Sequence, residues 1–457
     1  MSDQNFDIVV LGGGSAGYAV ALRAVQLGKT VAIIEKDKLG GTCLHRGCVP
    51  TKATLHSAEL ADEAKGAAAY GVNVDFQGVD AAKVKDFRDG IVATKFKGLQ
   101  GLLKAKKIEI IEGAGTLTSS TTVDVDGTTV TGKNIVLATG SYSKSLPGLD
   151  ITGRVITSEQ ALQMDWTPKK AVVLGGGVIG VEFASLWRSF GAEVTIIEGL
   201  PHLVPNEEEV VSKGLERAFK KRGIGFKVGA RFSGVEQNDQ GVVVKTEAGD
   251  SFEADVLLVA VGRGPVTDGM GFEDVGVELD RGFVTVNDRL ETSVKGVYAV
   301  GDIVPGLQLA HRGYQQGLFV AEEIAGLSPR MVEDVNIPKI TYCEPQVASV
   351  GLSEAKAKEI HGDDAVESYE YNLAGNAKSS ILGTAGFAKM VRVKDGPIVG
   401  VHMLGARVGE LIGEAQLIVN WDAYPEDVAQ LVHAHPTQNE VLGEAAMKLA
   451  GQPLHAI

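Results

Sequence analysis

The first 35 residues change from an extended apolar pattern to a helical one and back again. The stretch FDIVVLG (6–12) is apolar almost throughout, which is typical of a buried strand. Apolar side chains then return at helical spacing between 15 and 26, and TVAIIE (30–35) is a second strand that ends in glutamate. Strand, helix and strand in this order predict a βαβ unit, in which the two strands are parallel.

The same pattern occurs a second time between residues 170 and 198. KAVVLGGGVIGVEFASLWRSFGAEVTIIE repeats the apolar strand, the apolar helix, a short glycine-containing turn and a second strand that ends in glutamate. Both copies carry G-x-G-x-x-G between strand and helix, and the glutamate follows the first glycine at the same offset. One such motif is weak, because glycine-rich turns also serve plain helix packing. Two copies with matched acids predict two dinucleotide-binding units.

Each position of the motif has its own physical role. The first glycine allows a tight turn, the second lets the backbone approach a pyrophosphate at the helix N-terminus, and the third lets helix and strand pack closely. The terminal glutamate would accept hydrogen bonds from a ribose, although a single glutamate there would more often be a solvated strand end. The residues concerned are Gly12, Gly14, Gly17 and Glu35 in the first copy, and Gly175, Gly177, Gly180 and Glu198 in the second.

Three more apolar runs follow these units and end in glycine-containing turns. NIVLATGS (134–141), VLLVAVGRGP (256–265) and GVYAVGD (296–302) have the composition of buried strands. Asp302 lies just beyond the last of them, where ligands of open parallel sheets bind. A simple turn aspartate is the plainer alternative for this residue.

The pattern changes from residue 337 onward to alternating strands followed by helices rich in Ala, Glu and Leu, without a nucleotide fingerprint. We therefore expect an α/β protein with two Rossmann-like dinucleotide-binding domains and a C-terminal α+β domain. The expected segments are 1–148 for the first part of the first domain, 149–268 for the second domain, 269–336 for the rest of the first, and 337–457 for the C-terminal domain.

Composition and charge exclude several classes of function. The chain has 457 residues, 44% of them hydrophobic, and a formal net charge of −14, which disfavours a nucleic-acid or anionic-membrane surface as the main partner. No apolar run reaches the length of a membrane span, and no targeting segment is expected before the first strand. With only three cysteines, the expected compartment is the reducing cytoplasm.

Two of the three cysteines, Cys43 and Cys48, lie close together in GGTCLHRGCVPTK (40–52). Nothing nearby completes a zinc site, and a structural disulfide would be unusual in a reducing compartment, so a redox disulfide is favoured. Positions i and i+5 of an ideal helix have Cα atoms roughly 8.6 Å apart, beyond the roughly 7 Å limit for a bridge. The segment is therefore expected to be distorted, which Gly47 permits, and Lys52 could favour a thiolate.

This segment resembles the active-site signature of the flavoprotein disulfide reductases, and the similarity extends over essentially the whole chain. The resemblance implies FAD and a nicotinamide dinucleotide as cofactors. It also implies that Cys48 is the thiolate beside the flavin and that Cys43 exchanges with the substrate. Lys52 and Glu182 would form a pair near the reactive edge of the flavin.

The resemblance assigns further residues to the cofactors and to acid–base chemistry. Glu35 would bind the adenosine ribose of FAD and Asp302 its ribityl chain. Gly140, Gly262 and Ala310 are further candidate cofactor-binding residues.

The C-terminal HAHPTQNE (433–440) matches the His–Pro pair that the family uses for acid–base catalysis. His435 would be the acid/base for the substrate thiol and Glu440 the carboxylate that orients it, since histidine titrates near neutrality and a carboxylate fixes its tautomer. His433 is not expected to be catalytic. Cys343 has no family role and is expected to be a small buried hydrophobic residue.

Two features that the sequence lacks indicate which members of the family it resembles most. Glu198 without a nearby arginine favours NAD over NADP, and no cysteine follows Cys343, which disfavours a mercuric-reductase-like enzyme. The resemblance thus implies a homodimer that oxidises dihydrolipoyl groups with NAD⁺. Expected partners are lipoyl domains of 2-oxo acid dehydrogenase complexes or the lipoyl carrier protein of glycine cleavage, and no metal is expected. The alternatives are another disulfide reductase or a non-catalytic flavoprotein subunit. The chain departs from the usual family residues at Val266, His45 and Arg46.

Overall fold

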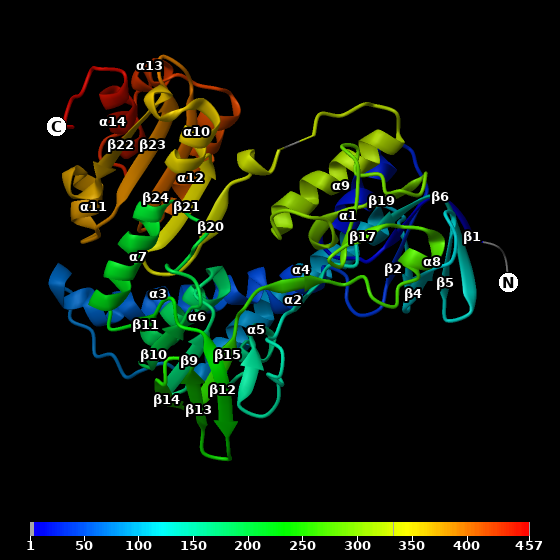
Figure 1. The fold of residues 1–457 in the computed structure, drawn as a ribbon, viewed down its shortest axis with the longest axis horizontal. Helices are drawn as coiled ribbons and strands as arrows, with labels where there is room; N and C mark the ends of the chain where they lie inside the picture. Colours follow the sequence, from blue (N-terminus) through cyan, green and yellow to red (C-terminus); the bar gives the residue numbers. More distant parts are fainter. Residues whose placement is uncertain (1–3, 332, 457) are drawn as a thin grey trace.

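The computed structural model describes residues 4–331 and 333–456, which form three units, each built on a large sheet (Figure 1). In the first unit the strand order is β3-β2-β1-β6-β5-β4, and β19 pairs with the end of β6 that β5 leaves open. All pairings are parallel except those that join β4, β5 and β6. The strands are β1 (Gln4–Leu11), β2 (Val31–Glu35), β3 (Glu109–Glu112), β4 (Gly115–Leu117), β5 (Thr122–Val125), β6 (Thr128–Leu137) and β19 (Val297–Ala299).

Two helices from opposite ends of the first unit cover one face of its sheet. Helix α1 (Ser15–Gln26) and helix α9 (Ala310–Ile324) pack so closely that a Cβ on Gly317 would lie 2.6 Å from the carbonyl oxygen of Ala16. Apolar side chains of both helices and of β1 and β2 make one core cluster. The other face is covered by β4, β5 and a segment containing α8 (Phe272–Val275), β17 (Leu279–Asp280) and β18 (Phe283–Val284).

A helical excursion separates β2 from β3. It consists of α2 (Gly41–Arg46), α3 (Cys48–Gly66) and the antiparallel α4 (Ala81–Ala105). Figure 1 shows α3 and α4 crossing the middle of the molecule, and α3 packs against α6 of the second unit. The excursion therefore places the start of α3 between the two parallel sheets.

The second unit repeats the parallel arrangement of the first. Its sheet has the order β11-β10-β9-β15-β8, and the antiparallel β12-β13-β14 covers one face. The strands are β8 (Val155–Thr157), β9 (Lys170–Leu174), β10 (Glu193–Ile197), β11 (Gly225–Lys227), β12 (Phe232–Gln237), β13 (Val242–Thr246), β14 (Ser251–Ala254) and β15 (Val256–Val259). The helices are α5 (Ser158–Ala161), α6 (Val178–Ser189) and α7 (Glu209–Lys221).

The third unit is antiparallel, with strand order β20-β21-β24-β23-β22. Side chains that alternate along β21 divide between two cores: Val347 faces the second unit, while Ala348 and Val350 face α12 and α14. The strands are β20 (Lys339–Thr341), β21 (Gln346–Gly351), β22 (Val366–Asn372), β23 (Phe387–Val393) and β24 (Ile398–Gly405). The helices are α10 (Glu354–His361), α11 (Ala377–Ile381), α12 (Val408–Asn420), α13 (Pro425–Ala429) and α14 (Glu440–Leu449). The fold class predicted from the sequence is confirmed.

The chain leaves and re-enters the first unit through neighbouring strands. Strand β7 (Ser141–Ser143), on the way out, is antiparallel to β16 (Arg263–Pro265), on the way back. The second unit is therefore inserted into the first between two strands that hold its ends together.

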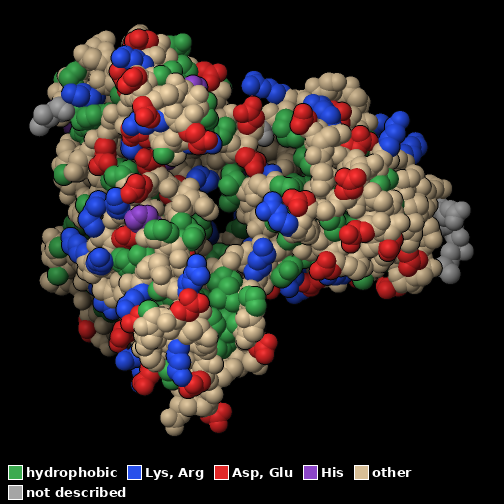
Figure 2. Space-filling view, viewed as in Figure 1, with side chains coloured by type: hydrophobic (Ala, Val, Ile, Leu, Met, Phe, Trp, Pro, Cys, Tyr) green, Lys and Arg blue, Asp and Glu red, His purple; other side chains and the backbone are tan. Residues whose placement is uncertain are grey.

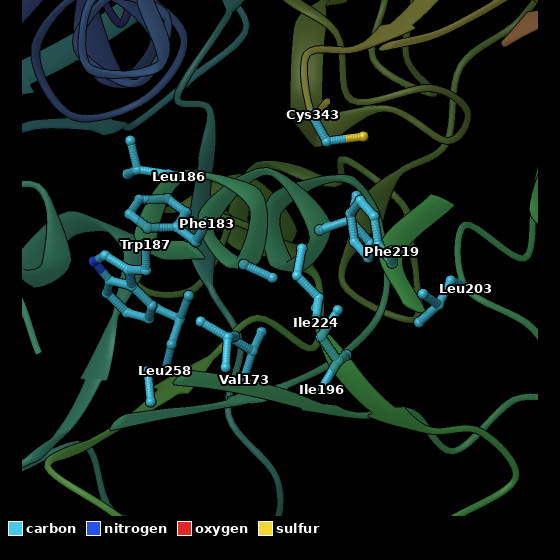
Figure 3. Packing of buried hydrophobic residues seen from close by; sticks show 14 of the residues in the cluster. Val173, Phe183, Leu186, Trp187, Ile196, Leu203, Phe219, Ile224, Leu258 and Cys343 are labelled. Atoms are coloured by element: carbon cyan, nitrogen blue, oxygen red, sulfur yellow. The ribbon is translucent and has the colours of Figure 1, made fainter. Parts of the chain in front are cut away.

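The largest apolar cluster crosses the boundary between the second and third units (Figure 3). Helix α6 contributes Phe183 and Trp187, α7 contributes Phe219, and the loop before β21 contributes Cys343. Cys343 is 1% exposed, so the expectation of a small buried residue is confirmed. The second and third units share one continuous core.

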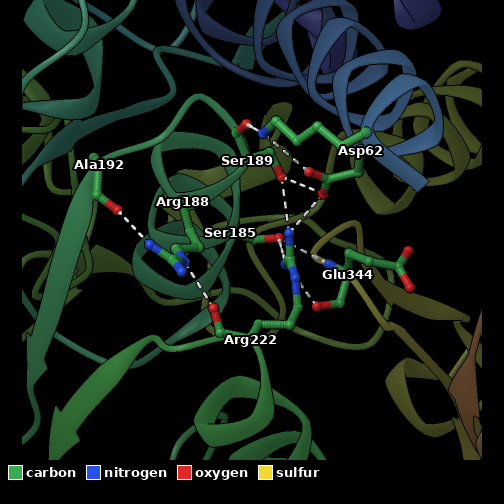
Figure 4. Close-up of polar contacts among 8 residues, drawn as sticks. Asp62, Ser185, Arg188, Ser189, Ala192, Arg222 and Glu344 are labelled. Atoms are coloured by element: carbon green, nitrogen blue, oxygen red, sulfur yellow. Dashed lines mark hydrogen bonds and ion pairs between the residues drawn. The ribbon is translucent and has the colours of Figure 1, made fainter. Parts of the chain in front are cut away.

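A half-buried arginine adds polar links at the same junction (Figure 4). Arg222 donates from Nη1 to Ser185 Oγ (2.7 Å) and to the carbonyl oxygen of Glu344 (2.9 Å). Its Nη2 donates to Asp62 Oδ2 and Ser189 Oγ, both at 2.8 Å. One guanidinium thus joins α3, α6 and the loop before β21.

The molecular surface mixes charges of both signs. Figure 2 shows acidic and basic side chains interspersed on the visible face, which is hollowed where the third unit meets the first. Within the described ranges, no helix is both long and apolar enough to cross a membrane.

We expect Arg222→Ala to lower the free energy of unfolding by about 2 kcal/mol, because it leaves the Glu344 carbonyl without its donor and removes a cation from the Asp62 carboxylate. Urea unfolding followed by circular dichroism measures the change. Arg281→Ala is the control: that side chain is 88% exposed, so its removal should change stability by less than about 0.5 kcal/mol. Equal unfolding midpoints for the two variants would contradict the role of Arg222 as a joint.

Candidate active site

The two glycine motifs have the same geometry. A Cβ on Gly12 would lie 2.3 Å from the Ala138 carbonyl oxygen, and one on Gly175 would lie 2.4 Å from that of Ala260. The third glycines, Gly17 and Gly180, are equally crowded by the carbonyl oxygens of the first ones. In contrast, a Cβ on the middle glycines Gly14 and Gly177, each at a helix N-cap, would meet nothing within 4 Å. The open space at each helix N-terminus fits a pyrophosphate held by backbone N–H groups.

The glutamates at the ends of the second strands are fixed by the backbone in the same way in both copies. Glu35 accepts from Gly13 N (2.7 Å) and Asp37 N (2.9 Å) through its two carboxylate oxygens. Glu198 accepts from Gly176 N (2.6 Å) and Leu200 N (2.7 Å). Each carboxylate is thus held beside its glycine turn, at the place where a ribose would follow the pyrophosphate.

The cysteine pair spans a break between two helices. Helix α2 ends at Arg46 and α3 begins at Cys48, and Gly47 between them has φ −140° and ψ −113°. The distortion expected at Gly47 is therefore confirmed. Cys43 and Cys48 are free thiols in the structure, and they hydrogen-bond to each other.

This hydrogen bond divides the protons unequally between the thiols. The bond from Cys43 lowers the pKa of Cys48 to about 7, and the nearby Lys52 ammonium acts in the same direction, while burial opposes both. The same bond, together with burial, raises the pKa of Cys43 well above its usual value. The reduced pair therefore carries its negative charge on Cys48 near neutral pH, as the expected roles require.

Lys52 is held by an ion pair with a residue of the second unit. Its Nζ lies 2.9 and 3.0 Å from the two carboxylate oxygens of Glu182, a residue that is 2% exposed. Burial by itself would lower the pKa of Lys52, but the Glu182 carboxylate outweighs that effect and raises it. Glu182 also accepts from Tyr342 N (2.9 Å), and Lys52 Nζ lies 4.9 Å from the centre of the Tyr342 ring. The pair thus joins all three units beside the thiols.

Asp302 lies in a polar cluster where β7 and β16 meet. Ser141 Oγ donates to Asp302 Oδ2 at 2.5 Å, and Arg263 Nε donates to Ser141 Oγ at 2.8 Å. Burial lowers the pKa of the Arg263 guanidinium, although the Asp302 carboxylate opposes this. Two glycines without a close Cβ neighbour, Gly140 and Gly262, adjoin the cluster, and they leave room beside it for a bound group.

Ala310, a predicted cofactor-binding residue, is the first residue of α9.

The predicted acid–base pair, His435 and Glu440, belongs to the third unit. His435 Nδ1 is 2.8 Å from Glu440 Oε1, as expected for a histidine oriented by a carboxylate, but its side chain is 71% exposed. Figure 1 shows that α13 and α14, which flank His435, lie at the outer end of the third unit, whereas α2 lies near the centre of the molecule. Within one chain, the helices on either side of His435 therefore lie apart from the helix that carries Cys43.

Two tyrosines near the thiols were not predicted from the sequence to be part of the site. Tyr18 and Tyr314 share a hydrogen bond between their hydroxyl groups (2.8 Å). Burial raises the pKa of Tyr18, and the nearby Cys43 and Cys48 add to the increase. Tyr18 directly follows Gly17 of the first motif, which could have indicated it, but no local pattern connects it with α9.

Two unusual residues between the cysteines have local structural roles. His45 Nε2 lies 2.9 Å from the Leu39 carbonyl oxygen, and its ring meets Phe96 edge-on with centroids 4.9 Å apart. Arg46 pairs with Asp37. Both interactions fasten α2 to its surroundings.

Comparison with known proteins agrees with this geometry. Residues 6–317 match the family model described as pyridine nucleotide-disulphide oxidoreductase, and 337–446 match the dimerisation domain of the same family. The chain belongs to the pyridine nucleotide-disulphide oxidoreductase family, so the resemblance seen in the sequence is confirmed.

Curated relatives match nearly the whole length of this chain. Mitochondrial dihydrolipoyl dehydrogenase of Pisum sativum is 39% identical, covering 99% of this chain and 93% of that protein. A dihydrolipoyl dehydrogenase of Bacillus subtilis is 36% identical over 98% of this chain and 99% of its own. The crystal structure of LpdA from Mycobacterium tuberculosis aligns with a TM-score of 0.90 and 27% identity, over 98% of this chain and 99% of that one.

Membership also settles the cofactors and the assembly. The family uses FAD and NAD, which are therefore the cofactors of this chain, and the two open glycine turns fit one dinucleotide each. The dimerisation domain makes the chain a homodimer.

We expect Lys52→Met to raise the pKa of Cys48 above about 7, by on the order of one pH unit, because the cation is lost and the buried Glu182 carboxylate remains. The pH dependence of Cys48 alkylation in the reduced protein, quantified by peptide mass spectrometry, reports the change. Lys97→Met, an exposed lysine on α4, is the control and should leave the midpoint unaltered. The same midpoint in both variants would show that Lys52 does not set the thiolate.

Proposed function

We propose that this protein is an NAD-dependent dihydrolipoyl dehydrogenase, which oxidises a dihydrolipoyl group to its disulfide and reduces NAD⁺. The observation that carries the proposal is the Cys43–Cys48 pair at the helix break, with Lys52 and Glu182 beside it, between two dinucleotide-binding turns. Relatives named dihydrolipoyl dehydrogenase that match nearly the full length support it.

The chemistry at the thiols is a pair of exchange steps. A substrate thiolate attacks Cys43 Sγ of the oxidised pair, forms a mixed disulfide and releases Cys48 as thiolate. The second substrate thiol, after losing its proton to His435, attacks the substrate sulfur of the mixed disulfide and releases Cys43, which completes the substrate disulfide. The low pKa of Cys48 makes it the better leaving group.

Glu440 prepares His435 for this proton transfer. It accepts from His435 Nδ1 and, at 2.8 Å, from Thr437 N. Burial would raise the pKa of Glu440, but the bond to His435 outweighs it and lowers the pKa. The carboxylate therefore stays charged and stabilises the imidazolium that forms when His435 takes the substrate proton.

When bound, FAD would supply a two-electron acceptor for the enzyme dithiol, and NAD⁺ would supply the final hydride acceptor. We propose that FAD binds to the glycines of the first turn and to Glu35, Asp302 and Ala310. We propose that NAD⁺ binds to the glycines of the second turn and to Glu198, whose fixed carboxylate suits a ribose diol and repels a 2′-phosphate. Lys52 and Glu182 lie between the two sets.

The biological setting follows from the substrate. We infer that the dihydrolipoyl group is carried by lipoyl domains of 2-oxo acid dehydrogenase complexes or by the lipoyl carrier protein of glycine cleavage, in the cytoplasm. We also retain the segments 1–148, 149–268, 269–336 and 337–457 as domains. The match of the dimerisation model to 337–446 supports the last of them.

Steady-state turnover tests the proposal. We expect rapid oxidation of dihydrolipoamide with NAD⁺, kcat/KM at least about 100-fold lower with NADP⁺, and negligible reduction of glutathione disulfide by NADPH. Cys43→Ser should abolish dihydrolipoamide oxidation, since no disulfide can form, while NADH oxidation by an artificial electron acceptor continues. Preference for glutathione disulfide and NADPH would identify a different disulfide reductase, and loss of both activities in Cys43→Ser would contradict the thiol mechanism.

Mixed dimers test whether His435 acts on the partner chain, a role supported by its exposure and by the separation of α13 and α14 from α2 in Figure 1. Cys48→Ser and His435→Gln homodimers should each be nearly inactive toward dihydrolipoamide. After co-refolding, about half of the dimers are hybrids with one intact site, so roughly a quarter of wild-type activity should return. If His435 served its own chain, every hybrid would carry a defect in both sites and mixing would restore nothing.

A further inference from the structure

The segment that carries the proposed acid–base residue is a loop between two helices. We call residues 433–440, between α13 and the first residue of α14, the histidine loop. Its middle is fastened by side chains of the third unit: Asn376 Nδ2 donates to the Thr437 carbonyl oxygen (2.9 Å), and Gln438 Nε2 donates to that of Ala406 (3.0 Å). These contacts hold the backbone after His435 but leave the two ends of the loop to other groups.

One carboxylate on α12 contacts both ends. Glu414 Oε1 lies 2.7 Å from Nε2 of His433, the first residue of the loop. Glu414 Oε2 accepts from Nδ2 of Asn439 at 2.5 Å, directly before Glu440. The Glu414 side chain is 22% exposed and that of His433 is 11% exposed, so solvent competes little for these bonds. Glu414 therefore bridges the start and the end of the loop across its base.

The contact with His433 has the properties of a fixed ion pair. Glu414 raises the pKa of His433 against the effect of burial, and the backbone at Leu431 offers a second acceptor. The imidazolium form therefore pairs best with the Glu414 carboxylate. The ring also lies against α14 at Gly443, where an added Cβ would come within 2.6 Å of His433 Nδ1. His433 is thus clamped between α12 and α14.

Few contacts hold the side chain of His435 in place. Its side chain is 71% exposed, and Glu440, its hydrogen-bond partner, belongs to the same loop. The direction in which the imidazole points therefore depends on how the ends of the loop are held. Misplacing a catalytic group by about 1 Å can cost on the order of 100-fold in rate.

We propose that Glu414, acting through His433 and Asn439, is a positioning residue that fixes the histidine loop so that His435 and Glu440 are presented to the reacting thiols. This inference rests on the proposed function of His435. It assigns His433 a structural part in the reaction, consistent with the expectation that it is not itself catalytic.

Three variants of the full-length flavin-loaded dimer test the proposal. Glu414→Ala removes both contacts, and we expect kcat for dihydrolipoamide oxidation to fall on the order of 10- to 100-fold. Glu414→Gln keeps one acceptor for Asn439 and offers a donor to neutral His433, so it should stay within about threefold of wild type. Gln416→Ala, an exposed side chain two positions further along α12, is the control and should match wild type.

Two further measurements separate positioning from general damage. NADH oxidation by an artificial acceptor does not use His435, so it should be unchanged in Glu414→Ala, and the melting temperature should stay near that of Gln416→Ala. Hydrogen exchange by mass spectrometry should show faster exchange in peptides covering 433–440, and unchanged exchange around Cys43 and Cys48.

Three other results would contradict the positioning role of Glu414. Normal dihydrolipoamide turnover in Glu414→Ala would overturn it, and so would an equal loss of both activities or unchanged exchange in the histidine loop. A wild-type enzyme that does not oxidise dihydrolipoamide would instead refute the proposed function, while the exchange experiment would still decide whether Glu414 fixes the loop.

Discussion

The ion pair between Lys52 and Glu182 is the constraint on which the rest of the site depends. It places a cation from the thiol-bearing helix against a carboxylate from the second unit, in a position where Glu182 is almost fully enclosed. The Glu182 charge is not stable there alone, since an unpaired buried charge costs several kcal/mol. The pair therefore fixes α3 against α6, and Tyr342 N adds the third unit to the same carboxylate. This ion pair thus helps to hold the cofactor sites and the thiols in their relative positions.

Much of this arrangement is encoded locally. The repeated strand–helix–strand pattern and the equal offset of Glu35 and Glu198 predicted two similar units, and the structure shows the same backbone bonds to both carboxylates. The impossibility of bridging Cys43 and Cys48 on a regular helix predicted the break at Gly47. Both features depend on interactions between residues that are close in sequence, so spacing and periodicity are enough to predict them.

Features that join distant segments could not be predicted in this way. Tyr18 and Tyr314 meet only because α9 packs on α1. The junction at Arg222 needs three elements whose order in space no periodicity reveals. The sequence placed His435 in the active site through resemblance alone, because no local pattern connects the C-terminal domain with the cysteines. Tertiary contacts, and the two-fold assembly, decide all of these.

The insertion between β7 and β16 has a consequence for how the protein is made. The first sheet needs β19 to complete the edge of β6, and α1 needs α9 as its cover, yet both lie beyond the inserted unit in the chain. A ribosome adding about 5 to 20 residues per second exposes the inserted unit in full before either arrives. The part of the molecule that emerges first therefore cannot complete its sheet until the part that interrupts it has been synthesised. Its apolar faces stay uncovered for roughly 10 to 40 seconds, an interval in which chaperones could act.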